Sequence, residues 1–263
     1  MVRTFCSLIL LLWLAPASTA ERVISLAPSL TEIMQDLQAE HYLVGVLDAG
    51  PLAKELESVA KVGSLGQLNI ERLLELQPDL LLNWPGSISP RQLQQVQQLH
   101  IPVYHAQAKT LRELARQFTE IGALVNAAPQ GKQLTAQAHQ QLDSLEQRYQ
   151  RKKPIRVFYQ LWDKPMYTLG GGQIISDALS YCGAENVFAQ LPVLAPQVNL
   201  ETVLAAKPDL IVITHDQLRD SWPEAVKIPM ITVPDDGLER PSWQMFSALE
   251  KLCQAIDEAI KEK

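Results

Sequence analysis

Apolar and polar residues along the chain follow one pattern that occurs twice. In residues 67–84 an asparagine precedes apolar residues at helical spacing, and a Pro-Asp pair separates these from a second apolar run. Residues 197–214 repeat this order at a constant offset of 130 residues. Asn69 and Asn199 occupy the position of a helix N-cap, proline cannot continue the helix, and the apolar run is typical of a buried strand. Each copy therefore predicts a helix, a tight turn and a parallel strand, and two distant copies predict two similar lobes.

Short apolar runs and amphipathic segments alternate along the rest of the chain. Strands are predicted at 22–26, 43–47, 101–105, 155–160 and 228–233, and helices at 91–100, 110–121, 174–181 and from Ser242 onwards. Ser29 with Glu32 predicts a capping box that opens a further helix directly behind the first strand. Residues 48–66 are weakly patterned and predict a loop with one short helix. Such alternation is typical of α/β folds, in which ligands bind at the carboxyl ends of the strands.

A long helix is predicted between the two lobes. Pro129 suits the first turn of a helix, and apolar residues continue at helical spacing to about Lys152. At 1.5 Å per residue such a helix reaches about 33 Å, enough to pass from one lobe to the other. A coiled coil is the alternative, although so few turns favour a strut. We therefore predict two Rossmann-like lobes, at 21–128 and 153–263, each a parallel-type sheet flanked by helices. A rigid connecting helix at 129–152 joins them, with the ligand cleft between the lobes.

The start of the chain predicts export. Arg3 precedes an apolar core too short to span a bilayer, and small residues lead to a cleavage site before Glu21. Residues 1–20 are therefore predicted to be a cleaved signal peptide, with the periplasm as destination. An uncleaved membrane anchor is the alternative.

Charge and cysteine content limit the partners. The formal net charge is −6, and no basic cluster occurs, which argues against nucleic acid and against an anionic membrane surface. Cys6 lies within the predicted signal peptide, so Cys182 and Cys253 remain. In an oxidising compartment two cysteines suggest one disulfide in a soluble monomer, whereas two buried free thiols are the alternative.

Three motifs resemble a known family. Ser25–Glu32 is similar to the opening motif of the periplasmic binding proteins for iron chelates and cobalamin, and Thr168–Gly171 and Cys182–Phe188 resemble signatures of that family's second lobe. The similarity covers almost the whole chain after the signal peptide and is strongest to members that bind cobalamin. It implies a substrate-binding protein that delivers cobalamin or a related corrinoid to the permease dimer and ATPase of an ABC importer, with no enzymatic activity and no cofactor of its own. A ferric siderophore or haem chelate is the alternative ligand.

The resemblance also implies residues for the ligand cleft. These are Ala27, Pro28, Gly66, Trp84, Trp162, Tyr167, Asp236 and Arg240. Aromatic residues on loops can form flat apolar walls for a macrocycle, while a few polar groups fix its orientation; ordinary core or surface packing is the alternative for each. Where the cobalamin-binding members carry further aromatic residues, this chain has Leu65, Ala195 and Gly237, and their tyrosine-rich loop is replaced near 48–51.

Glu71 and Glu201 occupy equivalent positions of the repeat, in the first turn of each predicted helix. In the resembling family one acidic residue on each lobe pairs with arginines of the permease, and these two positions match. A carboxylate there also favours the helix dipole, so a structural role is the alternative.

Two other classes of protein find less support. His105 and His215 follow predicted strands, but a zinc or manganese site needs a third ligand that the sequence does not indicate. Gly170–Gly172 precedes a helix without the lysine and hydroxyl residue of a phosphate-binding loop, and no motif of a hydrolase or kinase occurs. An enzyme is therefore the weakest interpretation.

Overall fold

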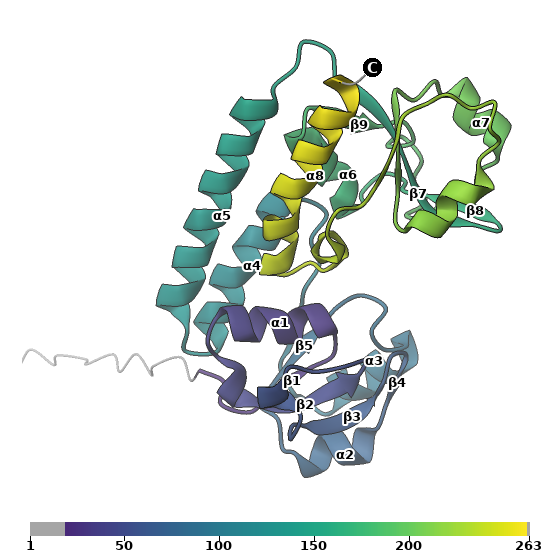
Figure 1. The fold of residues 1–263 in the computed structure, drawn as a ribbon. Coiled ribbons are helices and arrows are strands. Elements are labelled where there is room, and N and C mark those ends of the chain that lie inside the picture. The colour runs from purple at the N-terminus through teal and green to yellow at the C-terminus, as the bar shows by residue number, and fades with distance from the viewer. Residues whose placement is uncertain (1–18, 262–263) are drawn as a thin grey trace, which may run out of the picture.

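The computed structural model describes residues 19–261, so residues 1–18 of the predicted signal peptide lie outside the described residues. This part of the chain contains two β-sheets flanked by helices and a layer of three further helices beside them (Figure 1). Within residues 19–261 the first sheet has six strands, and its order is β4 (Gln67–Leu68), β3 (Ala60–Ser64), β2 (Leu43–Asp48), β1 (Val23–Ser25), β5 (Leu80–Asn83), β6 (Val103–His105). All neighbours pair in parallel except β3 and β4.

Helices cover both faces of this sheet. Apolar residues of α2 (Ile70–Glu75) and α3 (Pro90–Gln98) pack on one face, where Ile24, Leu73 and Val96 are fully buried. On the other face α1 (Pro28–Asp36) buries Leu30 and Ile33. We call this sheet with α1, α2 and α3 the first lobe. Burial on both faces explains why its strands are continuous apolar runs rather than alternating ones.

The second sheet follows the same plan. Among the described residues it has five strands, in the order β11 (Met230–Thr232), β10 (Leu210–Ile213), β7 (Ile155–Asp163), β8 (Met166–Thr168), with β9 (Ala184–Asn186) beside the start of β7. Strands β9, β10 and β11 are parallel to their neighbours, and β8 is antiparallel to β7. Helix α7 (Leu200–Ala205) packs on one face and α6 (Ile174–Tyr181) on the other. We call this sheet with α6 and α7 the second lobe.

Three helices form a layer beside both lobes. They are α4 (Leu111–Leu124), α5 (Ala128–Tyr149) and α8 (Trp243–Lys261), which stand together in Figure 1. Helices α4 and α5 approach so closely that a Cβ at Gly131 would lie 2.3 Å from the carbonyl oxygen of Phe118. One apolar core joins this layer to inner-face residues of both sheets, such as Val23 and Val157. The connection between the lobes is therefore a packed core as well as a single helix.

Several sequence predictions are confirmed. The α/β class with two mostly parallel sheets is as predicted. Asn69 and Asn199 cap α2 and α7, with each side-chain oxygen accepting a backbone N–H three residues on, and Thr110 caps α4. Cys182 and Cys253 form a disulfide that ties the end of α6 to α8.

Three predictions about local structure were wrong. The capping box at Ser29 does not form, because α1 begins two residues earlier than a Ser29 cap requires, with Ala27 at the N-cap and Pro28 in its first turn. The segment 48–66 contains strand β3 in addition to a short 3₁₀ helix at Lys54–Leu56, since its pairing with β2 and β4 outweighs its weak apolar pattern. The long helix ends at Tyr149 rather than near Lys152.

None of the helices described for residues 19–261 is both long enough and apolar enough to span a bilayer.

Candidate functional site

The first wall of the candidate site lies where two neighbouring strands end. Strands β1 and β5 pair in parallel, with Ser25 opposite Leu82, so the residues that follow each strand meet at the same sheet edge. After β1 the chain turns through Ala27 into α1, and after β5 it continues into Trp84. The hydroxyl of Ser25 donates to the Ala27 carbonyl at 2.9 Å and accepts from Thr31 at 2.9 Å. These two buried bonds fix the turn that presents Ala27 and Pro28 beside Trp84.

Residues of the second half of the chain close this edge from the opposite side. A short 3₁₀ helix, η4 (Asp236–Glu239), leads into Arg240 and Pro241 just before α8. Together they line an open cavity of about 380 Å³. Its lining residues are Ala27, Pro28, Ser29, Leu65, Trp84, Pro85, Gly86, Ser87, Glu239, Arg240 and Pro241. Four predicted ligand residues are therefore brought together in one cavity between the lobes.

Gly66 lies next to this cavity and shapes its edge. Its φ of +82° is in the region that favours glycine, and its N–H donates to the carbonyl of Ser87 at 2.9 Å. This bond joins the loop after β3 to the loop after Trp84. Leu65, exposed by 64%, is thereby held at the cavity.

Trp162, Tyr167 and Asp236 belong to other parts of the second lobe. Trp162 and Tyr167 face each other across the β7–β8 hairpin, and Trp162, exposed by 54%, packs edge-on against His215 with ring centroids 6.1 Å apart. Asp236 begins η4. Of the residues described, these three are not among those lining the cavity that holds Trp84.

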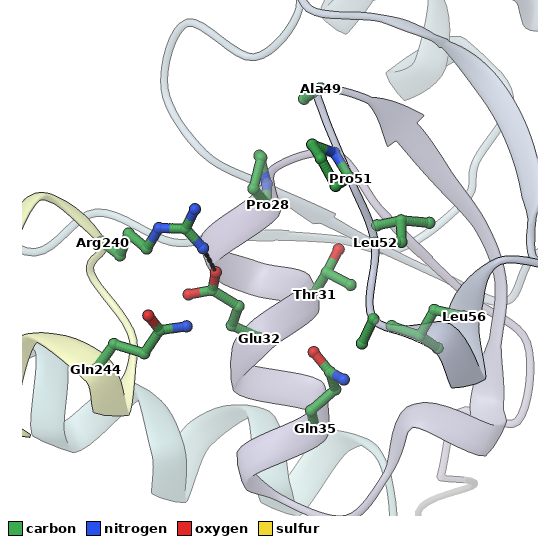
Figure 2. Close-up of a pocket in the computed structure, with 11 residues that line it drawn as sticks. Pro28, Thr31, Glu32, Gln35, Ala49, Pro51, Leu52, Leu56, Arg240 and Gln244 are labelled. Carbon is green, nitrogen blue, oxygen red and sulfur yellow. Dashed lines mark hydrogen bonds and ion pairs between the residues drawn. The ribbon is translucent and has the colours of Figure 1, made fainter. Parts of the chain in front are cut away.

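A contact between α1 and the start of α8 was missed in the sequence. Figure 2 shows Arg240 pointing to Glu32, and both line a second cavity of about 220 Å³, which shares Pro28 and Arg240 with the first. One carboxylate oxygen of Glu32 accepts from the Arg240 guanidinium, and the other accepts from the Ser242 hydroxyl at 2.7 Å. The spacing of Ser29 and Glu32 suggested a local cap, whereas the structure uses Glu32 to bind a residue that follows it by 208 positions.

Two carboxyl groups near this contact have altered proton affinity. Burial raises the pKa of Asp36 from 3.8 to about 6; the N–H of Trp243, which donates to it at 3.0 Å, opposes this rise, and the charge of Glu32 adds to it. Burial also raises the pKa of Glu239, and the neighbouring charge of Asp236 raises it further, while His215 lowers it. Because Glu32 already pairs with Arg240, the polar part of the site is mixed in charge rather than strongly cationic.

The two predicted docking residues lie on the outer parts of the lobes. Glu71 and Glu201 are in the first turns of α2 and α7, and both are exposed. Neither lines the cavity between the lobes, as far as residues 19–261 are concerned.

The departures from the aromatic pattern have different structural settings. Ala195 is exposed on a loop before α7, where a larger side chain has room. Gly237 is buried, and a Cβ there would lie 2.9 Å from both the Asp235 carboxylate and the Gln244 carbonyl. An aromatic residue at 237 would therefore require η4 and the start of α8 to shift.

The histidines considered as metal ligands are far from forming a metal centre. His105 ends β6 beside Asn83, and His215 packs against Trp162. Within residues 19–261, no three histidine, cysteine, aspartate or glutamate residues gather in a geometry able to hold a metal ion.

Two similar α/β lobes with a lined cavity between them define the class of two-lobed ligand-binding proteins. Residues 23–251 match the family model described as periplasmic binding protein. The chain belongs to the periplasmic binding protein family, as the sequence motifs predicted.

Individual relatives agree with this assignment. The chain is 34% identical to the vitamin B12-binding protein of Yersinia pestis (strain Pestoides F), over 97% of this chain and 92% of the relative. The crystal structure of the periplasmic vitamin B12 binding protein BtuF of Vibrio cholerae matches with a TM-score of 0.79 and 31% identity, covering 91% of this chain and 98% of that one. The periplasmic heme binding protein HutB of Vibrio cholerae shares the fold, with a TM-score of 0.75 at 18% identity, and covers 89% of this chain and 98% of its own.

Proposed function

We propose that this protein captures cobalamin or a related corrinoid in the periplasm and delivers it to the permease dimer of an ABC importer. The observation that carries the proposal is the cavity between the lobes, where Trp84 and Pro28 face Arg240. An indole and a proline ring offer flat apolar surface, and a guanidinium offers several hydrogen-bond donors. A corrinoid has a matching combination of a broad ring and carbonyl-bearing side chains.

The ligand surface extends beyond the cavity that holds Trp84 in this proposal. Cobalamin is much larger than a cavity of about 380 Å³, so its remaining surface needs further contacts. Trp162, Tyr167 and Asp236 supply these from the second lobe, and Ala27 and Gly66 let the ligand approach the backbone of the first. The relatives that are 34% and 31% identical are named for vitamin B12 binding, which supports a corrinoid over the other chelates.

Cellular location and partners follow from the same proposal. Residues 1–20 act as a cleaved signal peptide, and the disulfide between Cys182 and Cys253 suits the oxidising periplasm. The mature protein works as a monomer without catalysis, with its lobes at 21–128 and 153–263 joined by the segment 129–152, which holds most of α5. Glu71 and Glu201 pair with basic residues of the two permease subunits, because equivalent carboxylates on two lobes suit a twofold partner.

Haem is the second candidate ligand, because HutB, named for heme binding, shares the fold. Calorimetric titration of the purified protein with cyanocobalamin, cobinamide and haemin separates the two. We expect a saturable heat with cyanocobalamin or cobinamide, accompanied by quenching of tryptophan fluorescence, and none with haemin. Binding of haemin alone would replace the corrinoid with haem as the ligand, and no heat with any of the three would reject both.

A further inference from the structure

Helices α2 and α7, which carry Glu71 and Glu201, each have an exposed leucine at the same position of the repeat. Leu74 in α2 is exposed by 47% and Leu204 in α7 by 41%, although the residues just before them, Leu73 and Val203, are fully buried. The two leucines are related by the repeat offset of 130 residues. Single exposed leucines are ordinary on protein surfaces. The same exposure in both copies, next to the same carboxylate, is not explained by packing within either lobe.

The leucine and the glutamate of each helix share one face. Leu74 follows Glu71 by three residues, and Leu204 follows Glu201 by three. Residues three apart on a helix are neighbours on its surface. We call Glu71, Leu74, Glu201 and Leu204 the paired rim surface. It presents two copies of a carboxylate beside an apolar side chain.

Both helices are held in place by equivalent contacts at their two ends. Each is six residues long and is capped at its start by the asparagine described above. At the other end an arginine side chain binds the final carbonyls. Arg22 donates through Nη2 to Leu76 at 2.6 Å and through Nε to Gln77 at 3.1 Å. These bonds satisfy carbonyls at the end of the helix that have no partner within it, and so tie this end to the sheet.

Arg156 repeats this arrangement in the second lobe. Its Nη2 donates to Ala206 at 2.9 Å and its Nε to Lys207 at 3.3 Å. Ala206 and Lys207 are the repeat equivalents of Leu76 and Gln77. The two leucines are therefore presented on two helices with matching backbone restraints, which lowers the entropy lost when a partner binds.

A hollow lies beside each helix as well. Gln67, Leu68 and Asn69 help to line one of about 410 Å³ in the first lobe. Their repeat equivalents help to line one of about 540 Å³ in the second. A partner that also covers the start of each helix thus meets a concave surface there, which suits an inserted side chain.

The charges select the kind of partner. A second copy of this chain docking through the same surface would place glutamate against glutamate, and like charges across an interface are costly. A partner with a cationic group beside an apolar one complements each half. Because the halves are related by the repeat, two identical subunits related by a twofold axis match both at once.

We infer that Leu74 and Leu204 are the apolar anchors of the paired rim surface, and that its occupant is the twofold permease dimer, each subunit offering an apolar side chain beside a basic one. This inference rests on the proposed transport function. It adds that the leucines supply binding that salt does not screen, whereas the glutamates supply the part that salt does screen.

The test measures binding of the protein to the corrinoid permease–ATPase complex of the same bacterium in nanodiscs, at low and at high salt. The variants are L74A/L204A, E71A/E201A and L124A, a control at another leucine, exposed by 38%, on α4. We expect L74A/L204A to bind at least tenfold more weakly at both salt concentrations. E71A/E201A should differ from the wild type mainly at low salt, and L124A should not differ. Each variant must keep the wild-type melting temperature; L74Q/L204Q replaces the alanine pair if that pair unfolds.

Each outcome decides one question. Wild-type binding by L74A/L204A with impaired E71A/E201A overturns the leucine anchors and leaves the proposed docking intact. Wild-type binding by both double variants, or no binding by the wild-type protein, overturns docking at these helices. If sedimentation shows a wild-type dimer that L74A/L204A abolishes, the occupant is a second copy of the chain and the inference is wrong.

Discussion

The outer rims of the two lobes match each other, whereas the two walls of the cleft do not. At the rims Glu71 and Leu74 recur as Glu201 and Leu204, with the same asparagine cap and the same arginine contacts. In the cleft the first lobe offers Trp84 and Pro28, and the opposite side offers Glu239, Arg240 and Pro241. The exposed residues thus match at the rims and differ in the cleft, as expected for the proposed twofold permease at the rims and an asymmetric ligand in the cleft.

The largest predicted effect concerns the disulfide between Cys182 and Cys253. Within residues 19–261, the first lobe has no such covalent link. Replacing Cys182 and Cys253 together with alanine opens a loop with a sequence separation of 71 residues. The free energy of unfolding should fall by about 4 kcal/mol, because the unfolded chain regains loop entropy. Urea denaturation of the variant and of the oxidised wild type measures this difference. A loss below about 1 kcal/mol would mean that packing of α6 on α8 suffices without the bond.

Trp84 and Trp162, both proposed to contact the ligand, should differ in their importance for binding. Trp84→Ala should weaken cyanocobalamin binding about a hundredfold, equivalent to about 2.7 kcal/mol, because Trp84 lines the cavity between the lobes. Trp162→Ala should weaken it less than tenfold, since Trp162 lies on an exposed hairpin. Calorimetry on both variants checks the ranking. A larger loss for Trp162 would place the main ligand wall on the second lobe.

The contact between α1 and the start of α8 lies near the cleft, where the two lobes differ. Its contribution to stability should depend on pH. The pKa of Asp36 is raised to about 6, so a proton on this group stabilises the fold fully below about pH 4, and this contribution is lost as the pH rises through 6. Asp36→Asn keeps an acceptor for the Trp243 N–H without the charge. It should therefore stabilise the protein by about 1 to 2 kcal/mol at pH 7 and have little effect at pH 4.

Urea denaturation at both pH values measures this effect. Asp235→Asn is the control, because the pKa of Asp235 is lowered by its bond to Lys251 and its substitution should be destabilising at pH 7. Equal effects of Asp36→Asn at both pH values would contradict the assignment.

The smallest effects should be equal in the two lobes. Asn69 and Asn199 accept the backbone N–H of Arg72 and Thr202 at 2.9 Å and 2.8 Å. Alanine at either position should lower the free energy of unfolding by about 1 kcal/mol, the usual value of an N-cap. Thermal unfolding of the two variants side by side tests the match. A difference above about 1 kcal/mol would show that the repeat is alike in sequence but not in energetics.

The sequence predicts the repeated elements well because their signals are local. An asparagine cap, a proline stop and an apolar run act within a few residues, as at Asn69 and Asn199. The contact of Glu32 with Arg240 could not be predicted in this way, because it joins residues far apart in the chain and its local pattern suggested a cap. Strand β3 was missed for a related reason. Its apolar signal is weak, and pairing with β2 and β4 decides its conformation.

The predicted ligand residues also differ in whether a local signal or a distant contact decides their position. The motif after β1 and the tryptophan after β5 each follow a predicted strand, and the structure brings them to one sheet edge because parallel neighbouring strands end together. The position of Trp162 on an exposed hairpin depends on the antiparallel turn of β7 into β8. No spacing in the sequence indicated that turn.

The central claim is that the cleft binds the ligand while the rims bind the permease. Calorimetric titration of Trp84→Ala and of the E71A/E201A double variant with cyanocobalamin, side by side, tests it most directly. The account predicts that the tryptophan variant loses most of its affinity and that the double glutamate variant keeps the wild-type dissociation constant. Loss of affinity in the glutamate variant, with wild-type binding by Trp84→Ala, would contradict the assignment of these two surfaces.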